Sequence, residues 1–130
     1  MRALSLLLMS AALAGCATQP APERSAQAAA EFQRLTAGKV AGEPVSCLAP
    51  YRSGDMVTID DNTVVFKDGR TAYVNHMNGG CSGLGSGFYA LVTRSNGSGL
   101  CRGDIAHVVD PTSGFTVGSC AVGDFIPYKG

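Results

Sequence analysis

The sequence predicts a mainly β protein: a small disulfide-bonded antiparallel barrel or sandwich of about six to seven short strands, preceded by a short N-terminal helix. Two observations favour this class. After residue 40 the chain consists of short apolar-alternating segments separated by turn residues, without helical stretches between them. This part of the chain also carries an even number of cysteines, as small exported domains often do.

The helix is expected within residues 23–37, where helix-forming residues dominate. Phe32 and Leu35 lie three residues apart, with alanines on the neighbouring turn, so they form a thin apolar stripe. Gly38 follows and is a typical residue at which a helix ends. A linker without secondary structure is the alternative interpretation of this segment.

A three-stranded antiparallel meander is the next predicted element. Its segments are rich in β-branched and aromatic residues, which favour strands. Asp61-Asn62 and Asp68-Gly69 supply the turns, and an Asp-Gly pair tolerates the positive φ of a tight hairpin. The expected strands cover residues 56–60, 63–67 and 70–77.

Four more strands are expected after a glycine-rich loop at residues 78–87. In the second of them, alternation places Ile105 and His107 on one face and Ala106 and Val108 on the other. Closing these strands into a barrel would remove exposed sheet edges. The four strands are expected at residues 88–94, 104–110, 115–120 and 124–128.

The N-terminal residues have the layout of a secretory signal. Arg2 precedes an apolar run of about 11 residues, which is shorter than the roughly 20 that a membrane-spanning helix needs. The run ends in Leu-Ala-Gly-Cys, which resembles the lipobox of bacterial lipoproteins. In those proteins the cysteine thiol receives a diacylglycerol, the chain is cut before the cysteine, and the new amino group is acylated, for example with palmitate. An ordinary signal peptide cleaved beside a cysteine is the alternative.

From this layout we expect residues 1–15 to be a signal peptide and Cys16 to be the lipid attachment site. Residues 16–39 would form a lipidated tether with the short helix, and residues 40–130 the β-rich domain. Ala17, and not aspartate, follows the cysteine. By resemblance to enterobacterial sorting rules, this favours a lipid-anchored location in the outer membrane, facing the periplasm.

Two disulfides are expected from the remaining cysteines, which are Cys47, Cys81, Cys101 and Cys120. The gaps between them are 34, 20 and 19 residues, whereas zinc ligands come in close pairs, so we expect no metal at these positions. Three connectivities are possible, and the sequence does not choose among them. Of these we favour Cys81–Cys101 with Cys47–Cys120, which closes one short and one long loop.

Four segments in fixed order resemble a family of small, uncharacterised proteobacterial lipoproteins that is defined as a domain of unknown function. They share four cysteines and the Gly103-Asp104 pair after the third cysteine. The resemblance covers residues 38–129 and implies lipid anchoring, periplasmic exposure and a compact β-rich domain. It implies no reaction and no catalytic residues. The segments are residues 41–47, 59–84, 99–110 and 118–128.

Several motifs have a simpler interpretation than a ligand site. The glycine-rich loop at residues 78–87 lacks the Gly-Lys-Ser/Thr ending of a P-loop and is followed by a strand. The Arg102-Gly103-Asp104 triplet resembles an integrin-binding motif, but a turn in which Asp104 accepts hydrogen bonds from backbone amides explains it. These segments therefore predict turns and loops.

Catalytic and metal-binding groups are sparse in the sequence. His76 and His107 could join Asp104 or Asp110 in a metal site, but isolated strand histidines are usually surface residues. Serines are numerous, yet none lies in a nucleophile elbow that is followed by a helix. The adjacent carboxylates Asp60-Asp61 are expected to point apart at a turn. We therefore expect no catalytic residues, no metal and no cofactor.

The composition excludes nucleic acid as an expected partner. Arg2 would leave with the signal peptide, so 9 of the 10 basic residues would remain against 10 acidic residues, and no basic patch is present. We expect a non-catalytic interaction module in the periplasm, attached to the membrane through its lipid, that binds another envelope protein or peptidoglycan. The alternatives are an inhibitor of a periplasmic enzyme such as lysozyme, or a weak metal or ligand binder.

Overall fold

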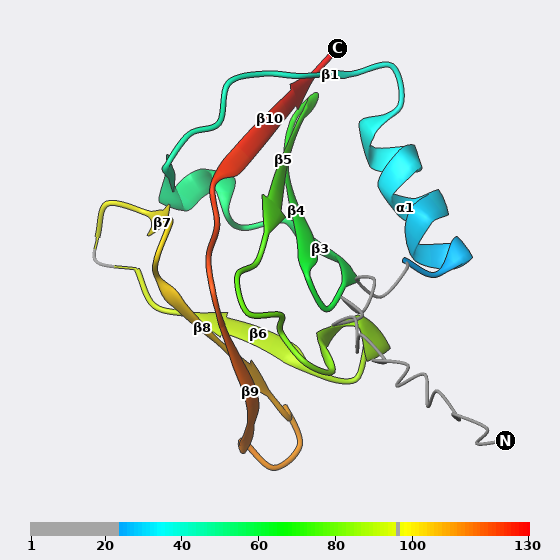
Figure 1. The fold of residues 1–130 in the computed structure, drawn as a ribbon. Helices are drawn as coiled ribbons and strands as arrows, with labels where there is room; N and C mark the ends of the chain where they lie inside the picture. The colour runs from blue at the N-terminus through cyan, green and yellow to red at the C-terminus, as the bar shows by residue number, and fades with distance from the viewer. Residues whose placement is uncertain (1–23, 96) are drawn as a thin grey trace, which may run out of the picture.

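The computed structural model describes residues 24–95 and 97–130 (Figure 1). Over these residues the chain forms one α-helix, α1 (Ala26–Thr36), and ten strands in three antiparallel sheets. The predicted mainly β class with an N-terminal helix is therefore confirmed. The expected signal peptide at residues 1–15, Cys16 and the first part of the tether lie outside the described residues. None of the described helices is long and apolar enough to cross a membrane.

The largest sheet has five strands in the order β1-β10-β5-β4-β3. The predicted meander forms three of them, and Gly69 closes the β4–β5 turn with a φ of 57°. Pairing runs without a break from Thr63 opposite His76 to Asp68 opposite Thr71. The strands are β1 (Val40–Ala41), β3 (Met56–Asp60), β4 (Thr63–Asp68), β5 (Thr71–His76) and β10 (Phe125–Lys129).

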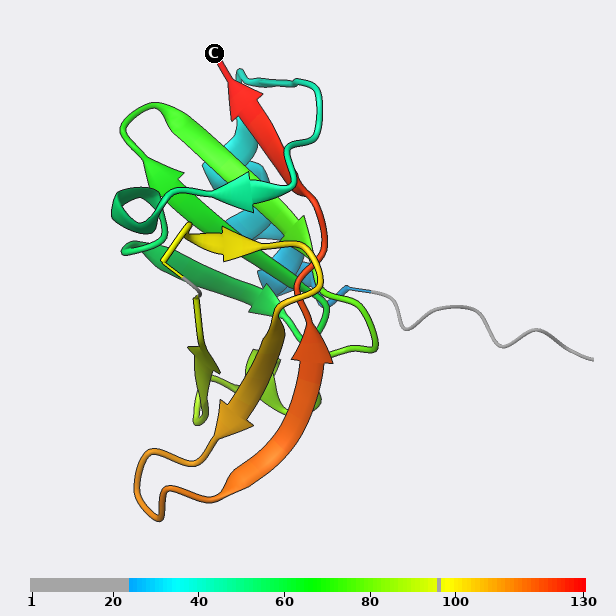
Figure 2. The same cartoon turned by 90° about the vertical axis from the view of Figure 1, so that its left-hand side faces the viewer.

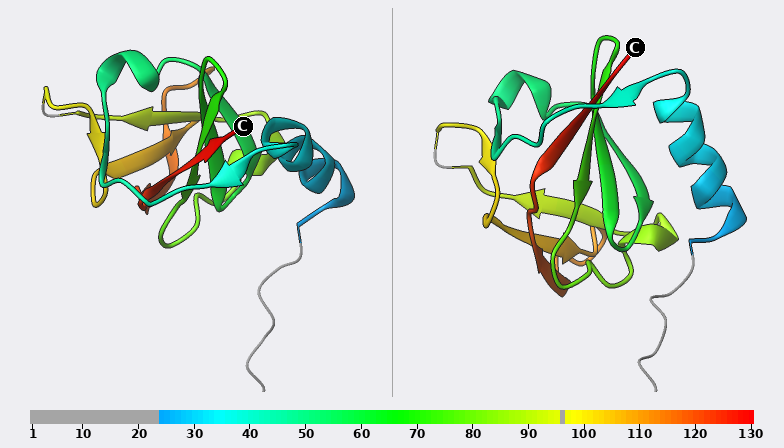
Figure 3. Two further views of the ribbon diagram at one scale, coloured as in Figure 1. Left: turned by 90° about the horizontal axis from the view of Figure 1, so that it is seen from above. Right: turned by 45° about the horizontal axis from the view of Figure 1, so that its top comes forward.

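Helix α1 covers one face of the five-stranded sheet (Figure 3). Ser25 caps its N-terminus by accepting a hydrogen bond from the Ala28 backbone N–H at 3.1 Å. Ala28 and Leu35 are buried against the sheet, and Phe32 makes an edge-on contact with Tyr128 at 6.2 Å between ring centroids. The predicted apolar stripe is thus the face that packs on the sheet.

A three-stranded sheet in the order β6-β8-β9 packs against the other face of the five-stranded sheet, as the main buried cluster shows (Figure 2). Ala106 and Val108 point into this core, where Phe66 and Phe125 meet at 5.8 Å between ring centroids. Ile105 is exposed, so the predicted alternation in this strand is confirmed. The strands are β6 (Ala90–Thr93), β8 (Ile105–Val109) and β9 (Thr116–Ala121).

A two-stranded sheet joins β2 (Cys47–Leu48) to β7 (Leu100–Cys101). Strands of two residues leave no alternation in the sequence, so the prediction of about six to seven strands missed β1, β2 and β7. Gly99 permits this pairing because a Cβ there would lie 2.1 Å from the Leu48 carbonyl oxygen. The described residues also form two 3₁₀-helices, η1 (Pro50–Arg52) and η2 (Leu84–Ser86).

The four cysteines form two disulfides, as expected, but the pairing that we favoured was wrong. Cys47 bonds to Cys101 and Cys81 bonds to Cys120. The first pair forms because β2 and β7 place Cys47 directly opposite Cys101, with 4.0 Å between their Cα atoms. The register between β2 and β7 thus determined which cysteines are bonded, and the length of the closed loop did not.

The three sheets do not close, so of the predicted barrel or sandwich the barrel was wrong. The chain leaves β9 at Ala121 and joins the five-stranded sheet at Phe125, and the residues between them break the ladder. The buried Asn75 side chain spans this break: it donates to the Gly123 carbonyl oxygen at 2.8 Å and accepts from the Gly123 N–H at 2.9 Å. A Cβ on Gly123 would lie 2.2 Å from the His76 carbonyl oxygen, so only glycine fits there.

Candidate functional site

A groove runs between helix α1 and edge strand β3. It consists of two adjoining cavities of about 410 and 490 Å³, which share Ser25, Ala28, Ile59 and Gly85 in their walls. We call it the α1 groove. Volumes of this size lie within the range of small-ligand sites. Its remaining wall residues are Arg24, Gln27, Ala30, Glu31, Arg34, Thr58, Asp60, Asp61, Asn62, Gly80 and Ser82.

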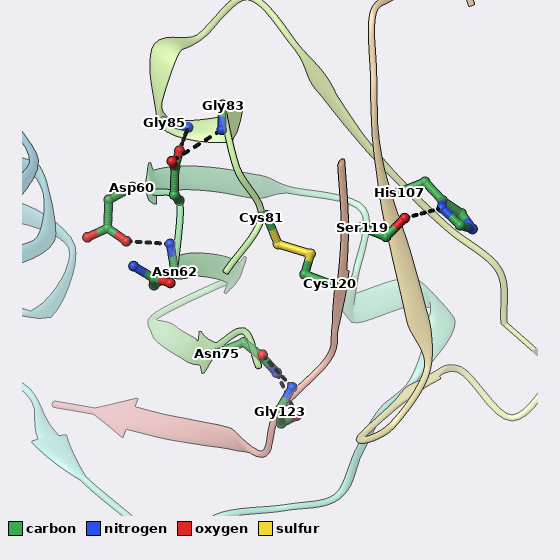
Figure 4. The surroundings of a disulfide bond; sticks show 11 residues. Asp60, Asn62, Asn75, Cys81, Gly83, Gly85, His107, Ser119, Cys120 and Gly123 are labelled. Carbon is green, nitrogen blue, oxygen red and sulfur yellow. Dashed lines mark hydrogen bonds between the residues drawn. A yellow bond between two sulfur atoms is a disulfide. The ribbon is translucent and has the colours of Figure 1, made fainter. Parts of the chain in front are cut away.

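Asp60 and Arg24 form an ion pair at one end of the α1 groove. The Arg24 Nε lies 2.8 Å from the Asp60 Oδ2, and its Nη2 donates to the Thr63 hydroxyl at 3.0 Å. The other carboxylate oxygen of Asp60 accepts from the Asn62 N–H at 2.8 Å (Figure 4). Burial raises the pKa of the Asp60 carboxyl, but the hydrogen bonds from Asn62 and Arg24 outweigh it and hold the pKa below its usual value.

Asp61 points away from Asp60 and ties the glycine-rich loop to the β3–β4 turn. Its carboxylate accepts from the Gly83 N–H at 3.2 Å and the Gly85 N–H at 2.7 Å, and its carbonyl oxygen accepts from the Cys81 N–H at 2.6 Å. The two carboxylates thus diverge, as predicted. Because these loop amides donate to Asp61, they are not free to cradle a phosphate.

The helix side of the α1 groove carries charges of both signs over a small apolar floor. Arg34 Nε donates to Glu31 at 2.9 Å, and this hydrogen bond lowers the pKa of the Glu31 carboxyl. Ala28 and Ile59 are buried beneath, and Gln27 is exposed at the rim. The charged groups Glu31 and Arg34 are thus paired with each other, while the side-chain amide of Gln27 at the rim is exposed.

The residues considered for a metal site are not brought together. His76 lies in the five-stranded sheet, with its Nδ1 at 3.4 Å from the Thr63 hydroxyl, and His107 lies in the three-stranded sheet. The His107 Nδ1 is 2.9 Å from the Ser119 hydroxyl (Figure 4). No group of three or more histidines, cysteines or acidic residues among the described positions is arranged to hold a metal ion.

The two aspartates considered with those histidines accept hydrogen bonds within turns. Asp104 accepts from the Cys101 N–H at 2.8 Å, and Gly103 has a φ of 90°, so the predicted turn at the Arg-Gly-Asp triplet is confirmed. Asp110 accepts from the Thr112 N–H at 2.8 Å, and this hydrogen bond lowers the pKa of its carboxyl. Both carboxylates thus act on the local backbone.

A second surface feature is apolar and lies at one end of the three-stranded sheet. Phe88 and Phe115 are 79% and 74% exposed. Phe88 precedes β6 and Phe115 precedes β9, and the register places Ala90 and Thr116 on either side of Val109. Both phenylalanines therefore lie at the same end of this sheet, which we call the Phe88/Phe115 end. Val117, in the strand that follows Phe115, is 47% exposed.

Sequence reasoning identified neither surface. The α1 groove depends on where α1 packs relative to β3, and periodicity within each segment does not carry that information. For the Phe88/Phe115 end a signal was present but unused: Phe88 and Phe115 lie in stretches, residues 84–93 and 111–119, that contain no lysine, arginine, aspartate or glutamate.

Comparison with known proteins supplies a family but no function. Neither the curated proteins nor the solved structures contain a match to the chain. Residues 1–124 match the family model described as "Family of unknown function (DUF6491)". That match includes most of the described fold and all four disulfide cysteines. The chain therefore belongs to the DUF6491 family of unknown function.

Proposed function

We propose that this protein is a lipid-anchored envelope lipoprotein whose β-rich domain is a non-catalytic interaction module. The domain would bind an extended segment of another envelope protein in the α1 groove. The observation that carries this proposal is the groove itself, which follows edge strand β3 and continues along one side of α1.

The proposed anchor rests on the Leu-Ala-Gly-Cys sequence that ends at Cys16. The thiol of Cys16 would carry the lipid, and residues 1–15 would be removed. Two disulfides in a domain of this size support an oxidising compartment such as the periplasm. An outer-membrane, periplasm-facing location is part of the same proposal.

Binding suits the chemistry of the α1 groove better than catalysis does. Asp60 is paired with Arg24, Glu31 with Arg34, and Asp61 with backbone amides, so each carboxylate is held by a fixed partner. A general base needs a carboxylate or imidazole that can reach a substrate proton. An apolar floor with hydrogen-bonding groups at the rim is instead typical of a surface that takes up a polypeptide, because main-chain groups along an edge strand and side-chain pockets both contribute.

Site-specific photo-crosslinking in native cells tests the groove. One variant carries a photoreactive residue at Gln27, which lines the groove, and the matched control carries it at Gln33. Both positions are exposed on α1, and Gln33 is not a wall residue. We expect one recurrent protein adduct from position 27 and none from position 33. Gln27→Arg should then abolish co-purification of that protein, and Gln33→Arg should leave it unchanged.

Two results would contradict parts of the proposal separately. Equal adducts from positions 27 and 33, or peptidoglycan fragments in place of a protein, would exclude a protein partner in the α1 groove. Mass spectrometry of the mature chain tests the anchor: a diacylated, N-acylated Cys16 is expected, and Cys16→Ser should release the protein from the membrane fraction. An unmodified Cys16 in native cells would exclude the anchor whatever the groove binds.

A further inference from the structure

The loop that presents Phe88 lies beside the start of α1. Arg24 and Ser25, where the described chain begins, line a cavity with Gly85, which is three residues before Phe88. Arg24 also pairs with Asp60 at the β3–β4 turn. The chain therefore enters the domain beside the loop that presents Phe88.

The opposite end of the domain is marked by η1. Arg52 forms an ion pair with Asp68 at the β4–β5 turn, whereas Arg24 pairs with Asp60 at the other end of β4. Tyr51, next to Arg52, is 76% exposed, which is close to the values for Phe88 and Phe115. The domain thus exposes aromatic side chains at two ends, of which only one adjoins the start of α1.

Chain length sets how far the domain can lie from an anchor at Cys16. Arg24 follows Cys16 by eight residues. Even a fully extended chain of this length spans at most about 29 Å, since each residue adds no more than about 3.6 Å. With a lipid at Cys16, Arg24 therefore lies within about 29 Å of the bilayer surface, and the Phe88 loop beside it is within reach of the bilayer.

We propose that Phe88 and Phe115 insert into the surface of the bilayer that holds the lipid anchor, so that the domain stands with its Phe88/Phe115 end on the membrane. Exposed aromatic and apolar side chains are stabilised at the boundary between headgroups and acyl chains. The chain around the two phenylalanines, residues 84–93 and 111–119, carries no charged side chain, and the carboxylate at this end, that of Asp110, accepts hydrogen bonds from the Thr112 and Ser113 N–H groups. This inference rests on the anchor at Cys16 that we proposed above.

The helix side of the α1 groove remains accessible in this orientation. Its helix-side residues Gln27 and Glu31 lie further along α1 than Arg24, and the helix leads away from the Phe88/Phe115 end toward the C-terminal strand (Figure 1). Docking of one end would limit rotation of the domain about its short tether. A partner approaching along the membrane would then meet the groove in a fixed orientation.

Tryptophan fluorescence tests the docking, because the natural sequence contains no tryptophan. Three single variants, Phe88→Trp, Phe115→Trp and Tyr51→Trp, place the reporter at sites of nearly equal exposure. The chain from Cys16 onward, which retains every described residue, is coupled through the Cys16 thiol to a maleimide-headgroup lipid. The vesicles contain phosphatidylethanolamine and phosphatidylglycerol with brominated acyl chains, which quench only tryptophans that have inserted into the bilayer. Chemical coupling supplies the attachment, so this test does not depend on acylation in cells.

We expect the emission of Trp at 88 and 115 to shift to the blue and to be quenched by the brominated lipid. Trp at 51 should keep the emission of a water-exposed indole. Equal, unquenched emission at all three positions would overturn the docking and leave the anchor untouched. A blue shift that appears without vesicles and grows with protein concentration would show that a second copy covers this end, and would also overturn it. An unmodified Cys16 in native cells would instead refute the proposed anchor, which mass spectrometry reports separately.

Discussion

The five-stranded and three-stranded sheets differ in how many of their faces are covered. In β4 the consecutive residues Thr63–Phe66 are all buried, because α1 covers one face of the sheet and the main core covers the other. In β8 burial alternates, and Ile105 is 54% exposed. The position of helix α1 therefore decides which sheet contains a strand that is buried at consecutive residues and which contains one whose burial alternates. The uncovered sheet is the one that presents apolar groups to its surroundings.

The two sheets should differ most in how much stability is lost when one phenylalanine in each is truncated. Phe125 is fully buried against Phe66, so Phe125→Ala should lower the free energy of unfolding by about 3–5 kcal/mol. Phe115 is 74% exposed, and Phe115→Ala should change the free energy of unfolding by no more than about 0.5 kcal/mol. Urea unfolding followed by circular dichroism measures both. Similar losses in the two variants would mean that Phe115 is packed and that the contrast is wrong.

The two disulfides also differ in how deeply they are buried. Cys81–Cys120 is buried and joins the glycine-rich loop to β9, whereas Cys47 of the other pair is exposed. Removing either pair by double alanine substitution should cost about 2–4 kcal/mol, because the closed loops of 39 and 54 residues are of similar length. Under mild reductant, however, Cys47 and Cys101 should be alkylated first. Mass spectrometry that found Cys81 labelled first would contradict the burial seen here.

The amide of Asn75 connects the two regions at the point where the chain crosses between them. Asn75→Ala leaves the Gly123 N–H and carbonyl without a buried partner, so it should cost about 1–3 kcal/mol in unfolding free energy. Asn62→Ala, at an exposed asparagine, is the matched control and should have a much smaller effect. Hydrogen exchange should show faster exchange at the Gly123 amide in the Asn75 variant. Unchanged protection there would argue against the bridging role.

The smallest effect concerns the ion pair that helps to hold α1 on its sheet. Because the pKa of Asp60 is lowered in the folded state, its contribution to stability is present above the unfolded pKa of about 3.9 and is lost as pH falls through the lower folded value. Asp60 is partly exposed, so this contribution is at most about 1 kcal/mol. Asp60→Asn should therefore show a shallower loss of stability below pH 4 in urea titrations. An acid profile identical to that of the wild type would rule out this role of Asp60.

Much of the fold was predictable because local signals and tertiary structure agree. The meander, the alternation around His107 and the helix with Phe32 on its packing stripe follow from periodicity and turn residues alone. Strand ends moved by one or two residues, as in β6, which begins at Ala90. The family expected from the cysteine and Gly-Asp pattern is a family of unknown function, as the match shows.

Other features could not be predicted because they depend on contacts between distant segments. The disulfide pairing follows from a two-residue ladder between β2 and β7, and such a short ladder leaves no trace in the sequence. Asn75 hydrogen-bonds to Gly123 where the chain crosses from β9 to β10, and an isolated asparagine in an apolar strand gives no sequence signal of that contact. The α1 groove likewise exists only once α1 has packed beside β3.

The position of β10 has a consequence for when the domain can fold. Although β10 is the last of the ten strands along the chain, it lies between β1 and β5 in the five-stranded sheet, and its Phe125 fills the core. Until residues 125–129 are available, β1 has no strand to pair with and the core lacks one of its largest side chains. A nascent chain therefore cannot complete the five-stranded sheet until residues 125–129 have been synthesised. For the exported lipoprotein that we propose, the same strand order would keep the sheet incomplete until β10 has crossed the membrane.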